Sequence, residues 1–280
     1  MKNLALMMTV LFISINSFSQ TEMKIRKTDG SIYSIPISEV DSVYYELSSA
    51  FPCGDQVTDI DGNLYNTVSI GGQCWIAENL KVTHYPNGDA IPLVTSSSEF
   101  DGLLANDVDD AYSYYNNNTS NEADTYGALY TYAAAIADDW QRDNAPDQGV
   151  CPDGWHIPTD VELKTLQIAL GMSTSDADAL GWQGTNEGSK LAGNSDLWNA
   201  GDLETDAEFG SSGFSLLPSG YRSNDGGNFT GLGSNTSFWS STEGDLSHQA
   251  YRRALSNGNK DIYRGTFTKS SAFPVRCVGN

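Results

Sequence analysis

Alternation of apolar and polar residues predicts short strands near both ends of the chain. Close to the N-terminus, alternating runs at residues 23–27 and 31–37 flank Thr28-Asp29-Gly30. Asp-Gly between two such runs is a strong turn signal, so this segment is predicted to form a β-hairpin. A second hairpin is predicted around Asp61-Gly62-Asn63, followed by a turn at Gly71-Gly72, where glycine permits a positive φ.

A helical period begins at residue 159. Thr159 and Glu162 match the capping-box pattern, and leucines then recur at helical spacing until Gly171. Further helices are predicted at residues 126–137, 175–180 and 187–192. The first of these lies in the Asp-rich and Asn-rich stretch 99–147, which is otherwise expected to be a long surface excursion.

After residue 213 the pattern changes to short apolar runs separated by turn residues. Strands are predicted at residues 214–217, 238–241, 250–255, 262–267 and 273–278. Turn signals lie at residues 225–228 and 256–259, and the second of these is typical of a hairpin. Because helices fill the middle of the chain and strands its two ends, the sequence predicts an α+β fold.

The first residues have the organisation of a secretory signal peptide. An apolar run at residues 4–15 follows Lys2 and precedes small residues before Gln20, so we expect the signal at residues 1–19. The run is shorter than the about 20 residues that cross a bilayer, and no other stretch approaches that length. We therefore expect a soluble exported chain without a membrane span, secreted, periplasmic or at the cell surface. A hairpin appendage and linker at residues 20–50 would precede the main domain at residues 51–280.

The chain is strongly acidic, with 36 Asp and Glu against 15 Lys and Arg and a formal net charge of -21. Nucleic acid is excluded as a partner, because phosphate binding needs clustered Lys and Arg. Anionic membrane surfaces are disfavoured for the same reason. Cationic partners and divalent metals stay open, although acidity alone commonly reflects solubility.

Four cysteines allow three pairings. We favour Cys53 with Cys74, which flank the strands of the second hairpin, and Cys151 with Cys277, which lie before the helical segment and in the last strand. Export makes disulfides plausible. Zinc is disfavoured because no Cys-x-x-Cys pair and no nearby histidine pairing occurs.

The turn at residues 59–63 resembles the start of a calcium loop. The bidentate glutamate of such a loop is missing, because Ile70 stands at its position. A plain turn is favoured over an ion site. His156 lies between Trp155 and the start of the capped helix, and a hydrogen-bonded structural role is favoured over a functional one.

Together, a set of short sequence blocks resembles the Fibrobacter succinogenes major paralogous domain, a family of exported bacterial proteins. The similarity covers roughly residues 53–278 and rests on blocks rich in Gly, Trp and Cys. These blocks are Asp61-Gly62-Asn63-Leu64-Tyr65, Ile70-Gly71, Gln73-Cys74-Trp75, Ala77-Glu78-Asn79-Leu80, Tyr126-Gly127, Cys151-Pro152, Gly154-Trp155-His156, Pro158-Thr159, Gly213-Phe214, Phe238-Trp239-Ser240-Ser241-Thr242 and Val275-Arg276-Cys277-Val278.

The resemblance implies a C-type-lectin-like fold. In that fold two main helices pack on a small, twisted antiparallel sheet with long loops, and a disulfide ties the first helix to the last strand. A bridge between Cys151 and Cys277 fits that role. The family does not itself imply a biochemical activity.

Export and the implied fold favour a non-catalytic binding module for a glycan or a protein. Fold alone is a weak argument for function, so side chains must carry the proposal. Trp198-Asn199-Ala200 lacks the carboxylate of the calcium-lectin motif, which counts against calcium-mediated sugar binding but leaves calcium possible as a cofactor. Aromatic stacking is the alternative, with Trp182, Trp198, Tyr221 and Trp239 as the candidate residues.

Two other functions are weighed against this one. The chain could be a structural or display protein of the cell surface without a defined small ligand. It could also be an enzyme related to the formylglycine-generating enzymes, which share the lectin-like fold and end in a similar Arg-Cys-Val stretch. Their chemistry needs reactive cysteines, and cysteines paired in bridges do not supply a thiolate. We therefore expect no catalytic, cofactor-binding or metal-binding residue.

Overall fold

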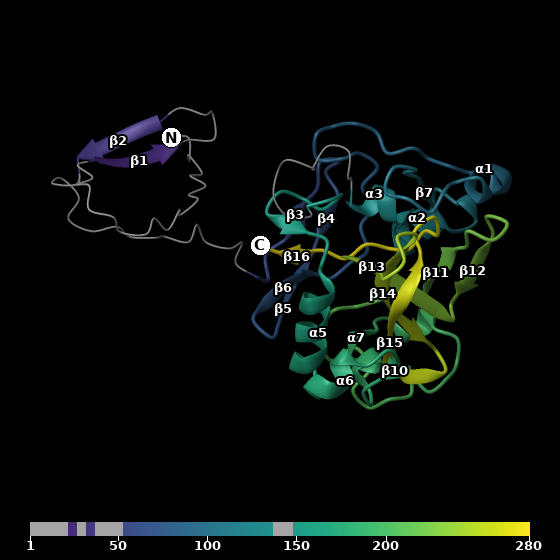
Figure 1. Ribbon diagram of the computed structural model, residues 1–280. Helices are drawn as coiled ribbons and strands as arrows, with labels where there is room; N and C mark the ends of the chain where they lie inside the picture. The colour runs from purple at the N-terminus through teal and green to yellow at the C-terminus, as the bar shows by residue number, and fades with distance from the viewer. Residues whose placement is uncertain (1–21, 27–31, 37–52, 137–147) are drawn as a thin grey trace. The chain divides into compact units, whose positions relative to one another are not determined.

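The computed structural model describes residues 22–26, 32–36, 53–136 and 148–280. Its contacts divide the chain into two units, residues 1–50 and residues 51–280 (Figure 1). In the first unit β1 (Glu22–Arg26) pairs with β2 (Ile32–Pro36) in an antiparallel hairpin, as predicted. The signal peptide expected at residues 1–19 lies outside the described residues.

A six-stranded sheet dominates the second unit. Its strand order is β10-β15-β14-β13-β11-β12, and only the contact between β11 and β13 is parallel. The strands are β10 (Gly181–Gln183), β11 (Ser219–Arg222), β12 (Phe229–Leu232), β13 (Asn235–Glu243), β14 (Gln249–Ser256) and β15 (Asn259–Thr268). Three predicted strands lie within β13, β14 and β15, and the predicted turn at residues 256–259 joins β14 to β15.

A smaller sheet has the order β5-β6-β16-β9. It contains β5 (Thr67–Ile70), β6 (Gln73–Ile76), β9 (Trp155–His156) and β16 (Val278–Gly279). Gly71 and Gly72 join β5 to β6 with φ values of 62° and 82°, as the predicted turn requires. Two short pairs complete the strands: β3 (Val57–Thr58) with β4 (Leu64–Tyr65), and β7 (Tyr112–Ser113) with β8 (Leu129–Tyr130).

The capped helix is confirmed as α5 (Asp160–Ala169). The Thr159 hydroxyl accepts from the Glu162 N–H, and the Glu162 carboxylate accepts from the Thr159 N–H, which closes the capping box. Helices α6 (Thr174–Asp178) and α7 (Glu187–Leu191) also lie where short helices are predicted. Figure 1 shows α5, α6 and α7 gathered near β10 and β15.

The helix predicted at residues 126–137 is interrupted near its start. Among the described residues of that range, Tyr126 ends α2 (Asn121–Tyr126) and α3 (Tyr132–Ile136) is helical, but between them Gly127 adopts φ 77° and the chain extends as β8. The remaining short elements are α1 (Ser97–Asp101), η2 (Tyr115–Asn117) and η3 (Ser195–Leu197). In the described part of the chain α5 alone exceeds six residues, so the expectation of two main helices is not met.

Two other expectations are corrected. The strand predicted at residues 214–217 does not form, because Ser215 has φ 53° and Arg276 donates to the carbonyl oxygens of Phe214 and Ser215. The last predicted strand is reduced to β16, since Pro274 has no N–H to donate. The stretch 99–147 is also more than a surface excursion, because its strands β7 and β8 are buried.

Two hydrophobic clusters lie on either side of the large sheet. One joins α5 and α7 to the sheet and includes Leu163, Leu191 and Phe238. The other surrounds the Cys151–Cys277 disulfide and includes, among other aromatic side chains, Trp155 and Trp239. Helices α5 and α7 therefore cover one face of the sheet, and α3 and loops cover part of the other.

Candidate functional site

An aromatic hollow of about 320 Å³ opens on the large sheet. We use that name for the cavity lined by Trp182, Tyr221, Asn235, Thr236, Ser237, Arg252, Ala254, Leu255, Tyr263, Phe267 and Phe273. Five different strands contribute to it, from β10 at one edge to β11 near the other. Its volume falls at the lower end of the range for small-ligand sites, about 300 to 1,000 Å³.

Strand register explains why these side chains meet. Trp182 lies opposite Tyr263, Tyr263 opposite Ala254, and Ala254 opposite Ser237. Directly opposed residues on antiparallel strands point to the same face, so this row runs across four strands on one side of the sheet. The small Ala254 and Ser237 leave the space that the larger rings border.

The Tyr263 ring lies over Gly265 on the same strand. A Cβ atom at Gly265 would lie 2.8 Å from Cε1 of Tyr263, so only glycine leaves the ring in this position. Arg252 is the cross-strand partner of Gly265, and its Cζ lies 5.0 Å from the centre of the Tyr263 ring. The missing side chain at residue 265 therefore lets an aromatic ring and a guanidinium share one wall of the hollow.

Two of the four predicted aromatic residues line this hollow. Trp182 is 42% exposed and packs edge-on against Tyr263, with ring centres 5.5 Å apart. Tyr221 is half-buried and contacts Phe267 and Phe273, with ring centres 5.9 and 5.4 Å away. Large rings of this kind provide apolar contact area in a partly solvated site.

The other two predicted aromatic residues belong to the core, which corrects the expectation that they offer stacking faces. Trp198 is 5% exposed, and its indole N–H donates to the carbonyl oxygen of Gly193. Trp239 is fully buried, donates to the carbonyl oxygen of Tyr130 and packs 4.6 Å from the Phe273 ring. Neither ring face is open to a ligand.

Arg252 and Tyr263 were not among the predicted site residues. Both lie in runs predicted as strands, and the Asn-Gly signal at residues 257–258 predicts a hairpin between those runs. The simple register of that hairpin predicts Arg252 directly opposite Tyr263, and an irregularity between Ala254 and Ser256 shifts the pairing by two residues, so Arg252 lies one row from Tyr263 on the same face. The hairpin signal in the sequence therefore places both residues on one face of the sheet, whereas aromatic character alone does not select the arginine.

Burial lowers the pKa of Arg252 to about 10, an effect that the nearby Tyr263 and Tyr221 hydroxyls oppose. The guanidinium therefore stays charged at neutral pH. Its Nη1 donates to the Ser237 hydroxyl at 2.9 Å, while its Nε is buried without a hydrogen-bond partner among the described residues. The hollow thus combines exposed aromatic surface with a cation that lacks a carboxylate partner in the described structure.

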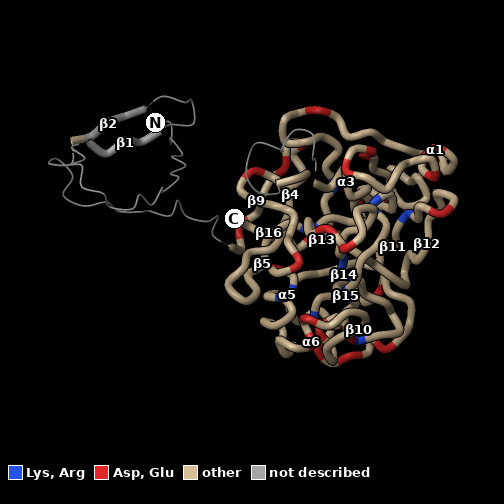
Figure 2. The backbone as a smooth tube through the Cα atoms, viewed as in Figure 1, with Lys and Arg blue, Asp and Glu red and all other residues tan. Residues whose placement is uncertain are grey.

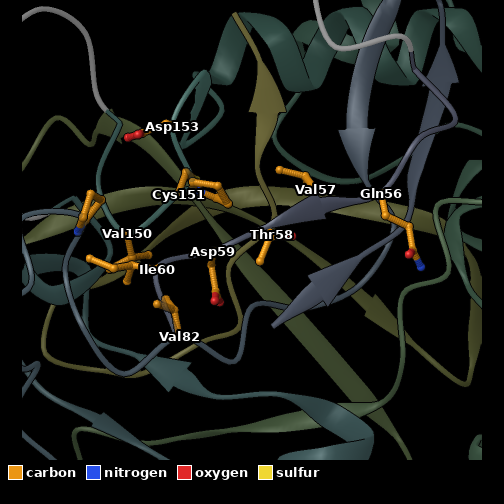
Figure 3. A pocket seen from close by; sticks show the side chains of 11 residues that line it. Gln56, Val57, Thr58, Asp59, Ile60, Val82, Val150, Cys151 and Asp153 are labelled. Atoms are coloured by element: carbon orange, nitrogen blue, oxygen red, sulfur yellow. The ribbon is translucent and has the colours of Figure 1, made fainter. Parts of the chain in front are cut away.

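A second hollow, of about 390 Å³, lies beside Cys151 and the turn after β3 (Figure 3). Its lining contains no aromatic ring. Of its two carboxylates, Asp59 accepts from the N–H groups of Asp61 and Asn63 and from the Tyr65 hydroxyl, 2.7 Å away. The other, Asp153, accepts from the side-chain amide of Gln148 at 3.2 Å. Both carboxylates are already engaged, so this hollow is the weaker candidate.

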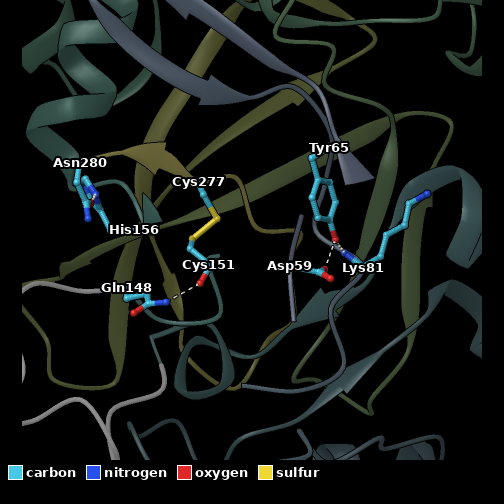
Figure 4. The surroundings of a disulfide bond; sticks show 8 residues. All are labelled: Asp59, Tyr65, Lys81, Gln148, Cys151, His156, Cys277 and Asn280. Carbon is cyan, nitrogen blue, oxygen red and sulfur yellow. Dashed lines mark hydrogen bonds between the residues drawn. A yellow bond between two sulfur atoms is a disulfide. The ribbon is translucent and has the colours of Figure 1, made fainter. Parts of the chain in front are cut away.

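Four cysteines form the two favoured disulfides, Cys53–Cys74 and Cys151–Cys277. Figure 4 shows the second bridge with His156 nearby. The two ring nitrogens of His156 lie 2.6 Å from Asn280 Oδ1 and 2.8 Å from Glu162 Oε1, in keeping with the structural role favoured for this residue.

Acidic positions are spread over many loops, whereas basic positions are few (Figure 2). Across the described ranges, no three His, Cys, Asp or Glu side chains gather in a way that could hold a metal ion. Within the same ranges, no helix combines the length and apolar character of a membrane span.

Comparison with known families matches residues 68–279 to the Fibrobacter succinogenes major domain. The match covers more than half of the chain and includes every residue that lines the aromatic hollow. No curated protein and no solved structure matches the chain. The chain therefore belongs to the Fibrobacter succinogenes major domain family.

Proposed function

We propose that this protein is an exported, non-catalytic binding module that takes a glycan in the aromatic hollow. The observation that carries the proposal is the position of Trp182, a large ring left 42% exposed at a hollow that Tyr221 also lines. Exposed aromatic surface beside polar groups is typical of sites that bind ligands with one apolar and one polar face.

The size of the hollow favours a small ligand over a protein surface. A volume of about 320 Å³ accommodates a compact ligand, whereas stable protein interfaces bury at least about 1,000 Å² in total. The polar lining residues Asn235, Thr236 and Ser237 supply amide and hydroxyl groups for hydrogen bonds to sugar hydroxyls. Rings for stacking and short polar side chains are thus present in one cavity.

Two features support a non-catalytic role. The residues lining the hollow include no Asp, Glu, His or Cys, so the cavity has no carboxyl, imidazole or thiol group for acid-base or nucleophilic chemistry. All four cysteines of the sequence are bonded in disulfides, which leaves no thiolate for chemistry of the formylglycine-generating type.

Export and a C-type-lectin-like fold are part of the same proposal. Two disulfides fit an oxidising compartment outside the cytosol. The Cys151–Cys277 bridge joins the segment before α5 to the residue before β16, which agrees with the connection that the family resemblance implies. Calcium is not required in this proposal, because the Asp59 turn is held by its own hydrogen bonds.

A glycan array probed with the purified chain, in calcium and again in chelator, tests the proposal. We expect selective binding that chelator leaves unchanged. Trp182→Ala should weaken that binding by about tenfold or more, because it removes the exposed ring. Leu64→Ala is the matched control, since it also truncates an exposed apolar side chain, but on β4 and outside the hollow.

Three results would count against the proposal. Binding abolished by chelator would indicate a metal-dependent site, and equal binding by Trp182→Ala and wild type would place the site elsewhere. No binding in either buffer would favour a structural or display protein without a small ligand.

A further inference from the structure

We infer that the ligand of the aromatic hollow is an acidic sugar whose carboxylate pairs with Arg252. The inference rests on the proposed function of that hollow and adds the chemical class of its ligand. Arg252 lines the cavity from β14, between the Trp182 edge and the Tyr221 wall.

Arg252 differs from the other arginines buried in the second unit. Those arginines place their donors on carboxylate, amide or main-chain oxygen atoms of the protein: Arg222, Arg253, Arg264 and Arg276. Within the described residues, the only hydrogen bond from the Arg252 guanidinium goes to the Ser237 hydroxyl, and no carboxylate pairs with it. A planar group with five N–H donors is therefore largely unused.

Three aromatic rings pack around the Arg252 guanidinium but do not accept its N–H hydrogen bonds. Its Cζ lies 5.0 Å from the Tyr263 ring centre, 4.9 Å from that of Phe267 and 5.6 Å from that of Phe273. Contact with ring faces stabilises a cation, but the rings provide no strong acceptor for the N–H groups in the guanidinium plane. The arginine is thus fixed in place with its hydrogen-bonding capacity free for a ligand.

Carboxylate is the anion that best fits this arrangement. Guanidinium binds carboxylate through two parallel hydrogen bonds, and such charge-assisted bonds are about twice as strong as neutral ones. Trp182 and Arg252 both contact Tyr263, so a ligand that stacks on the indole lies near the cation. A sugar ring carrying its own carboxylate meets both requirements in one compact molecule.

Because the protein has a formal net charge of -21, an anionic ligand needs a specific cation in the site to bind. At long range an acidic protein repels an anionic ligand, although salt screens that repulsion beyond about 10 Å at 0.1 M. Binding must then come from close contact with a specific cation. Arg252 is in a suitable position, because none of the residues that line the hollow is acidic.

The test uses D-glucuronate and its uncharged methyl ester, which share one sugar ring and differ in the carboxylate. Each is titrated into the isotope-labelled chain while the Nε–H signal of Arg252 and the indole N–H signal of Trp182 are followed by NMR. We expect glucuronate to shift both signals and to bind about tenfold or more tightly than the ester, the effect of one charge-assisted pair.

Two variants at the same position separate charge from packing. Arg252→Gln should remove the preference for glucuronate over its methyl ester. Arg252→Lys keeps the positive charge but loses the planar guanidinium that forms two parallel hydrogen bonds, so it should retain part of that preference. An unchanged thermal midpoint and an unchanged spectrum outside the hollow would show that each variant is folded.

Equal affinity for acid and ester, with the indole signal shifting in both titrations, would overturn the inference and leave the hollow as a neutral-sugar site. If neither compound shifts either signal, the inference fails. Loss of glycan binding in the array as well would reject the proposed function along with it. A preference for the acid that survives in Arg252→Gln would also overturn the assignment of the carboxylate to this residue.

Discussion

Replacing Asp160 with Asn tests how the principal helix is held to the large sheet. Asp160 is the first residue of α5, and its carboxylate accepts from Arg253 on β14 at 2.8 Å and from Arg264 on β15 at 2.7 Å. The Arg253 side chain is fully buried. Asp160→Asn would leave two buried or nearly buried cations without their counter-ion.

The expected loss in the free energy of unfolding follows from the lowered pKa of Asp160. Burial by itself would raise the pKa of Asp160, but hydrogen bonds and attraction from Arg264 and Arg253 outweigh it and lower the pKa from 3.8 to about 2. A change of one pKa unit corresponds to about 1.4 kcal/mol, so ionisation of Asp160 stabilises the fold by about 2 kcal/mol. Removing one partner of a buried ion pair costs about 3 to 5 kcal/mol. We therefore expect Asp160→Asn to lower the free energy of unfolding by about 2 to 5 kcal/mol.

Urea unfolding at pH 7, followed by tryptophan fluorescence with the disulfides intact, measures this difference. Asp178→Asn is the matched control: Asp178 pairs with Lys164 at 2.8 Å, but its side chain is 63% exposed. Because exposed ion pairs contribute about 0 to 1 kcal/mol, the control should be nearly neutral. Equal effects of the two substitutions would refute the claim that the buried pair holds α5 on the sheet.

The pH dependence gives the same prediction a second test. A carboxyl whose folded-state pKa is lowered contributes stability above its unfolded pKa, and that contribution is lost as pH falls through the folded value. For Asp160 the window runs from about 3.8 down to about 2, so about half of its contribution is gone near pH 3. The stability gap between wild type and Asp160→Asn should therefore narrow over this range, and a constant gap would contradict the pairing.

Further predictions concern covalent and local features of the fold. Replacing both Cys151 and Cys277 with Ala opens a bridge with a sequence separation of 126 residues and should cost about 5 kcal/mol in urea unfolding; a loss below about 1 kcal/mol would contradict it. Thr159→Ala removes the N-cap of α5 and should cost about 1 kcal/mol in the same assay. Gly188→Ala would drive a Cβ atom into the carbonyl oxygen of Asp261 where α7 packs on β15, so its thermal midpoint should fall. An unchanged midpoint would show that α7 can shift away freely.

Local sequence signals predicted the elements whose stabilising bonds lie within a few residues. The capping box of Thr159 and Glu162 fixed the start of α5, because both of its hydrogen bonds join residues three apart. The glycine pair at residues 71–72 and the Asn-Gly signal at residues 257–258 likewise placed two hairpin turns.

Elements decided by distant partners were not predictable in this way. Residues 214–217 have an apolar pattern that suits a strand, but the Arg276 side chain, far along the chain, takes the carbonyl oxygens a strand would use. In the Ala-rich stretch, Gly127 lies against the Leu80 carbonyl oxygen, an approach that only a glycine permits. In both cases a tertiary contact overrode the local preference.

In the candidate site, too, residue type is readable from the sequence, whereas exposure and position depend on distant contacts. Sequence pattern selected four aromatic residues by type, but their exposure depends on which loops cover the sheet, and Trp198 and Trp239 are covered. Arg252 could be placed only by the register of β14 against β15. Selecting binding residues in such a domain therefore requires cross-strand register together with residue type.

The most direct test of the central claim is the difference in glycan binding between wild type and Trp182→Ala, measured on one array in the presence of chelator. If the aromatic hollow is the binding site, wild type binds a restricted set of glycans and Trp182→Ala loses that set while remaining folded. Equal binding by the two proteins, or no binding by wild type, would contradict the account.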